Sequence, residues 1–172
     1  MQWPPNWEVF TELSDLQIQL HWATATIAFL LGLIIFSLPK GTVPHKTMGA
    51  IYAVLMITTA IAAFFVRRGD VSGLDYLSLK GMTWIHIFVP LTLFGIFGGL
   101  WGILVKKDRR AHSGPLIGSY IGALIIAGAL TFLPGRRMQL FFFGEPERID
   151  ELVEEYGRGA SLIGDLLAVL VQ

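Results

Sequence analysis

Four apolar runs, each long enough to cross a lipid bilayer, constrain this chain more than any other feature. They lie near Ile18–Leu38, Lys46–Val66, Met82–Val105 and Ser113–Pro134. A helix crosses the hydrocarbon core with about 20 apolar residues. Only 15% of the residues are charged, against about 25% in soluble domains, and buried helices of soluble proteins rarely run this long without a polar face. The sequence therefore predicts an all-α, integral membrane four-helix bundle.

The segments outside these runs divide the chain into three parts. We expect an N-terminal interfacial segment over 1–17, the transmembrane bundle over 18–137, and an amphipathic tail over 138–172. No basic region precedes the first run, which argues against a cleavable signal peptide. Glu145–Arg158 is acidic and amphipathic, and predicts a surface helix. Ala160–Val171 is apolar but too short to span, so it could dock on the bundle, lie in the interface or meet a partner.

The turns between the runs indicate a helical hairpin that is used twice. Pro39-Lys40-Gly41 ends the first run, because proline and glycine extend a helix only at a cost. The turn is short, so the first two spans are antiparallel neighbours. Pro90 lies four residues after His86 and predicts a kink in the third span, because proline offers no N–H to the carbonyl of His86.

All four histidines of the chain lie in the runs or at their starts. His21 and His86 begin spans that run in one direction, and His45 and His112 begin the return spans. At a rise of 1.5 Å per residue, the two pairs would lie roughly 25 Å apart along the bundle. The sequence therefore predicts one imidazole pair near each membrane face, on alternate helices of the bundle.

Such pairs are typical of b-type haem ligation, in which facing helices supply two axial nitrogens. Small residues beside the histidines, such as Ala25, Ala28 and Gly32 in the first span, would give the flat ring a slot. Cations at the span ends, including Arg110 and Arg136, would face the haem propionates. We expect His21 with His86 to bind one haem b, and His45 with His112 to bind a second.

Each of these features also has an ordinary structural explanation. Small residues are the usual packing residues of membrane helices, basic flanks are usual interface anchors, and a lone histidine at a span end is often only hydrated. Zinc would require three or four converging ligands. Thr24, Thr26, Thr58 and Thr59 are expected to bond back to their own helices. The basic and acidic residues, 13 of each, cancel, so nothing favours nucleic acid.

Several motifs resemble a bacterial family of small four-span membrane proteins described only as a domain of unknown function. They are PKGT…HKxMGxIY in the second span, IH in the third, and H…GxYIGxLIIAGxxTFxPGR in the fourth. The resemblance covers about residues 18–144 and implies a multi-pass protein of the bacterial inner membrane, with no activity attached. The paired histidines are also distantly similar to cytochrome b561, whose two b haems carry electrons across a membrane. This chain departs from that pattern in having four spans instead of six.

The function that we expect is therefore a dihaem b-type cytochrome, an electron carrier and not a catalyst of bond chemistry. Its partners would be membrane lipid and quinone or a larger redox complex. The alternative is a cofactor-free accessory subunit of a respiratory or photosynthetic complex, as a homo-oligomer or a hetero-complex subunit. The positive-inside rule favours His45 and His112 on the cytoplasmic side, with both termini outside.

Overall fold

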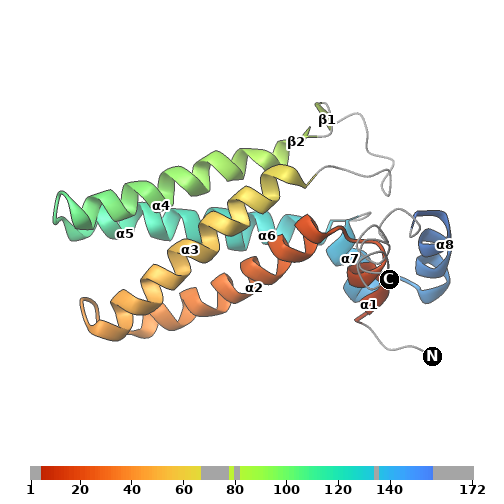
Figure 1. Cartoon of the computed structure of the whole chain (residues 1–172), viewed down its shortest axis with the longest axis horizontal. Coiled ribbons are helices and arrows are strands. Elements are labelled where there is room, and N and C mark those ends of the chain that lie inside the picture. Colours follow the sequence, from red (N-terminus) through yellow and green to blue (C-terminus); the bar gives the residue numbers. More distant parts are fainter. Residues whose placement is uncertain (1–4, 67–77, 80–81, 134–135, 157–172) are drawn as a thin grey trace, which may run out of the picture.

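The computed structural model describes residues 5–66, 78–79, 82–133 and 136–156. Two long helical hairpins form the bundle (Figure 1). The first consists of α2 (Leu16–Ser37) and α3 (Val43–Phe65). The second consists of α4 (Phe88–Leu104) and a composite helix of three pieces, which are α5 (Arg109–Ser119), the π-helical η3 (Tyr120–Ile126) and α6 (Ala127–Leu130). The all-α bundle that the sequence predicts is confirmed.

Among the residues that the structure describes, four helices are long and apolar enough to cross a bilayer. They are Leu16–Ser37, Val43–Phe65, Ile85–Leu104 and Arg109–Leu130. The second and fourth begin three or four residues earlier than expected, and helix caps explain the difference. The Thr42 hydroxyl accepts from the backbone N–H of His45, and the Asp108 carboxylate accepts from that of Arg110. Caps of this kind start a helix ahead of its apolar stretch.

The third span begins differently from the expected kinked helix. A two-residue antiparallel pair, β1 (Ser78–Leu79) with β2 (Met82–Thr83), leads into the 3₁₀ helix η2 (Trp84–Ile87), and α4 starts only at Phe88. Pro90 therefore lies in the first turn of α4, where a missing N–H is tolerated. The helix thus changes from 3₁₀ to α geometry just before Pro90, and the expected kink stays a prediction.

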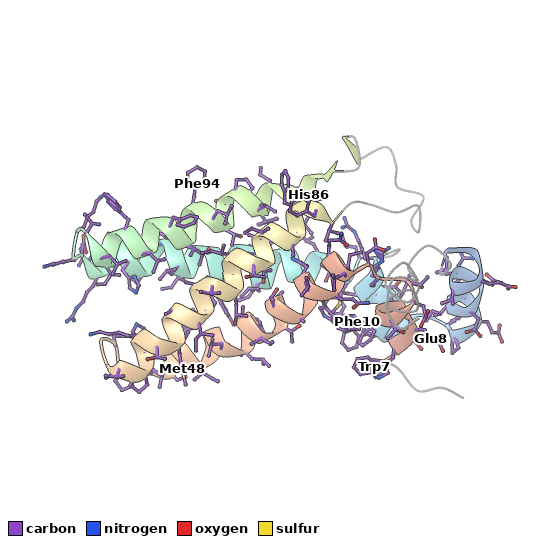
Figure 2. All side chains as sticks on the ribbon, viewed as in Figure 1. Trp7, Glu8, Phe10, Met48, His86 and Phe94 are labelled. Atoms are coloured by element: carbon purple, nitrogen blue, oxygen red, sulfur yellow. The ribbon has the colours of Figure 1, made fainter. Side chains whose placement is uncertain are left out.

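The bundle interior is small, and most large apolar side chains face outward. Met56 and Ile96 are fully buried, and Ala28, Tyr52 and Tyr120 complete the same cluster. By contrast, Leu30, Phe64 and Trp101 are about half exposed, and Phe94 points away from the bundle (Figure 2). Apolar side chains around the outside of long helices match a lipid surround.

Three short helices form a separate cluster at one end of the bundle, which we call the terminal cap. It consists of α1 (Trp7–Thr11), α7 (Arg137–Phe143) and α8 (Pro146–Tyr156). Their shared core contains Val9, Leu13, Phe141, Ile149 and Leu152. The Asn6 side-chain amide donates to the carbonyls of Leu140 and Gly144 at 3.1 and 3.0 Å, which joins the start of α1 to the end of α7.

The expected surface helix in the tail is confirmed as α8, with an acidic outer face and an apolar inner one. The cap lies at the end where α2 starts and α3 finishes (Figure 1), and we call this the capped end. The α2–α3 and α4–α5 turns lie at the other end, the turn end. Trp3, Arg67, Arg68 and the apolar segment Ala160–Val171 fall outside the described residues.

Candidate functional site

The four histidines divide between the two ends of the bundle. His21 near the start of α2 and His86 in η2 lie at the capped end, where Figure 2 labels His86 beside the end of α3. His45 in the first turn of α3 and His112 in the first turn of α5 lie at the turn end. His21 with His86, and His45 with His112, therefore lie at the same end of the bundle. The structure places one pair of histidines at each end, as the sequence predicts.

His21 is fixed by a hydrogen bond to the next helix. Its Nδ1 lies 2.9 Å from the carbonyl oxygen of Thr59. A carbonyl only accepts, so Nδ1 carries the proton and Nε2 keeps the lone pair of the neutral imidazole. This is the arrangement of most metal-binding histidines, in which the second nitrogen donates to a backbone carbonyl.

A pair of threonine hydroxyls stabilises the contact between α2 and α3 beside His21. Thr59 Oγ1 donates to Thr24 Oγ1 at 2.7 Å, and Thr24 Oγ1 donates to the Leu20 carbonyl at 2.7 Å. Thr24, Thr26 and Thr58 bond back to their own helices as expected. The expectation for Thr59 was wrong, because its buried hydroxyl faces α2 and finds a partner there.

His86 uses its other nitrogen. Its Nε2 lies 3.0 Å from the carbonyl oxygen of Val66, the residue that ends α3. The proton is therefore on Nε2 and the lone pair on Nδ1.

His112 resembles His21. Its Nδ1 lies 2.9 Å from the carbonyl oxygen of Gly99 on α4, which leaves Nε2 with the lone pair. Gly99 allows this contact because α4 and α5 are very close there. A Cβ at position 99 would lie 2.6 Å from Leu116 Cγ and 3.0 Å from the His112 carbonyl oxygen. Gly95 and Gly102 face α5 in the same way.

His45 is the exception among the four. Its Nδ1 is buried without a hydrogen-bond partner. The imidazole lies in the first turn of α3, at the turn end. Buried polar atoms in native proteins nearly always have a partner, so this nitrogen makes the turn end a candidate ligand site.

The slot that the sequence suggested beside His21 is only partly open. Ala28 and Gly32 are buried as expected, but a Cβ at Gly32 would collide with the ring of Tyr120 from the opposite hairpin. The Tyr120 hydroxyl donates to the Phe29 carbonyl at 3.0 Å. Side chains therefore fill the middle of the bundle, and a planar cofactor would have to lie toward either end.

The cations predicted to face propionates have different surroundings. Arg110 is exposed at the turn end, where its backbone N–H is held by Asp108 at 2.8 Å. Arg136 is half-buried at the capped end. Arg137, a further cation expected beside the His21 pair, has its Nε buried without a hydrogen-bond partner. Burial lowers the pKa of the Arg137 guanidinium, and Asp15 opposes that shift.

The donor set suits a haem better than a bare metal ion. Within the part of the chain that the structure describes, no three His, Cys, Asp or Glu side chains gather closely enough to hold a metal ion. A haem needs only two axial ligands, since its ring supplies four nitrogens. His21 and His112 fit that role directly, and His45 has an unpartnered nitrogen.

The fold and these pairs define a multi-pass helical membrane protein with two histidines at each end of its bundle. The family described as "Predicted membrane protein (DUF2306)" has a model that matches residues 18–147, and the chain belongs to this family. No curated protein and no solved structure matches the chain. The family described only as a membrane protein of unknown function is thus confirmed, and the likeness to cytochrome b561 stays a prediction.

Proposed function

We propose that this protein is a b-type membrane cytochrome that binds one haem at each end of its bundle and carries electrons between them. The observation that supports this most is the state of His21 and His112. Each donates Nδ1–H to a backbone carbonyl at 2.9 Å and keeps the Nε2 lone pair. One such histidine is present at each end, and each end contains a second histidine.

The histidines and the arginines have different roles in this proposal. His21 with His86 would hold one haem, and His45 with His112 would hold the other. Arg136 at the capped end and Arg110 at the turn end would attract the anionic propionates, which favour the membrane surface. A bound haem supplies one-electron redox chemistry, and the protein sets its potential through the ligands and the surrounding dielectric. The location is a bacterial inner membrane, with the turn end toward the cytoplasm.

A second candidate function is supported by the same hydrogen bonds. His21 joins α2 to α3, His112 joins α5 to α4, and His86 joins η2 to the end of α3. These imidazoles could serve purely as links between helices in a cofactor-free subunit of a larger membrane complex. The buried, unpartnered nitrogen of His45 favours the haem proposal over this one.

An absorption spectrum separates the two. Purified protein reduced with dithionite should show the sharp α and β bands of a six-coordinate b haem. A colourless protein, whose histidine variants lose thermal stability and nothing else, would support the subunit and overturn the cytochrome. Expression with added haem precursor controls for limiting haem supply.

A further inference from the structure

Two buried polar atoms without a partner lie on one face of α3. Among the described residues, only three side-chain atoms are buried and unpartnered, and two of them are His45 Nδ1 and Tyr52 Oη. Tyr52 is 6% exposed. Residues seven apart lie on the same helix face, two turns from each other. Because unsatisfied buried polar atoms are rare, a pair of them on one face marks a place where a ligand with matching polar atoms would be stabilised.

The helix backbone between these two residues is uncovered at one position. Gly49 lies between His45 and Tyr52 on the same face, and a Cβ at Gly49 would meet nothing within 4 Å. Side chains on a helix lean toward its N-terminus, so the Tyr52 phenol leans toward the turn that holds His45. The two hairpins also diverge toward the turn end (Figure 1). The face therefore combines two hydrogen-bonding atoms with room beside the helix backbone.

The deep side of this space is aromatic. The ring of Tyr120 lies 6.4 Å from that of Tyr52, with Phe29 stacked on it at 5.9 Å and Phe36 edge-on at 5.0 Å. The Tyr120 hydroxyl already donates to the Phe29 carbonyl at 3.0 Å. Tyr52 is therefore the phenol that still has a hydrogen bond to give, and a flat apolar ring would find a stacking surface beside it.

We propose that the face formed by His45, Gly49 and Tyr52 binds the head group of a lipid-soluble quinone. One ring oxygen accepts a hydrogen bond from Tyr52 Oη, and the oxygen at the opposite edge of the ring accepts one from His45 Nδ1. The quinone ring is flat and apolar, carries acceptors at two opposite edges, and reaches the site from the bilayer. Binding of the quinone depends only on the two unpartnered atoms. Its role as an electron partner rests on the proposed function.

His45 can bind both the proposed haem and the proposed quinone, because it has two ring nitrogens. A haem between His45 and His112 would take Nε2 of His45, and the proton on Nδ1 would then point to the quinone oxygen. The contact would place the quinone against a haem ligand. Lys40, Lys46 and Arg110 lie at the same end and are exposed, and Lys40 Nζ donates to the carbonyls of Ile35 and Phe36 at 2.9 Å.

The test is a binding titration of decylubiquinone into the full chain in lipid nanodiscs, followed by calorimetry. Tyr52→Phe removes one donor and keeps the ring, so the Kd should rise about tenfold, as for the loss of one buried hydrogen bond. Thr58→Val is the matched control, because the Thr58 hydroxyl lies on the same helix and bonds only to the Val54 carbonyl. The control should bind as the wild type does.

Two results would overturn the proposal. One is the absence of saturable binding to the wild type; the other is a Tyr52→Phe variant whose Kd is unchanged, as expected if a water molecule alone satisfies the phenol. The absorption bands of haem test the proposed function independently of quinone binding. A colourless protein that binds quinone through Tyr52 would refute the cytochrome and keep this site, and a haem protein indifferent to Tyr52→Phe would do the reverse.

Discussion

The two ends of the bundle hold similar histidine pairs in different ways. At the capped end, His21 and His86 both bond to carbonyls of α3, and His86 thereby links the second hairpin to the first. At the turn end, His112 bonds within its own hairpin to Gly99, and His45 has a buried nitrogen without a partner. The terminal cap also packs at the capped end, where the ring of Trp22 on α2 lies 4.7 Å from that of Phe141.

This difference indicates two kinds of site. The capped end is held together by the protein itself, so its geometry is set before any cofactor binds. The turn end has an unsatisfied nitrogen and hairpins that diverge, so a ligand between His45 and His112 would complete its structure. We therefore expect mutations at the turn end to alter ligand binding most readily, and mutations at the capped end to alter stability first.

The largest effect is expected from overfilling the α4–α5 contact. Gly99→Leu forces side-chain atoms into Leu116 and the His112 backbone, at a cost of about 1–3 kcal/mol in the free energy of unfolding. It should also displace His112 and reduce ligand binding at the turn end alone. Thermal unfolding in detergent and haem content measure the two effects.

Gly118→Ala provides the control for that experiment. It lies on α5, and an added Cβ there meets nothing within 4 Å. Replacing a helical glycine by alanine should leave stability unchanged or raise it by less than about 1 kcal/mol. Equal losses in both variants would show that the close α4–α5 approach is not what places His112.

A smaller effect is expected from loosening the terminal cap. Asn6→Ala removes two hydrogen bonds between α1 and the end of α7, each contributing about 1 kcal/mol. Limited proteolysis should then cut the chain near α1 faster than in the wild type. Ligand binding at the turn end should be unchanged, and a change there would contradict the independence of the two ends.

The smallest effect is expected at the threonine pair beside His21. Thr59→Val deletes the hydroxyl that bonds to Thr24, at a cost of about 1 kcal/mol, and should shift the reduction potential of the capped-end haem only. Thr26→Val, whose hydroxyl bonds to its own helix, should change neither stability nor potential. Redox titration followed in the α band provides the measurement, and a shift confined to the other haem would refute the assignment.

Much of this fold could be predicted from one sequence, because each span carries its own signal. Length and apolarity locate the four membrane helices, and Thr42 and Asp108 are residue types that cap helices. Hydropathy alone places the starts of α3 and α5 three or four residues too late, because the capping residues Thr42 and Asp108 precede the apolar stretch. The acidic helix α8 could be predicted for the same local reason, since its amphipathic pattern is contained within 11 residues.

The details of the site depend on contacts between distant residues, which a single sequence does not encode visibly. Gly32 looked like one wall of a haem slot, but the ring of Tyr120 occupies that space from the other hairpin. The unpartnered phenol of Tyr52 is visible only once its neighbours are in place. The histidine spacing could indicate which imidazoles would be near one another, but not which nitrogen of each would be bonded.

The most direct test is the number of haems per chain in single histidine variants, determined as the pyridine haemochrome on purified protein. We predict about two in the wild type and about one in both His21→Ala and His112→Ala, with the remaining haem at the opposite end. A wild-type chain that carries no haem after expression with haem precursor, or variants that retain the full content, would contradict the account.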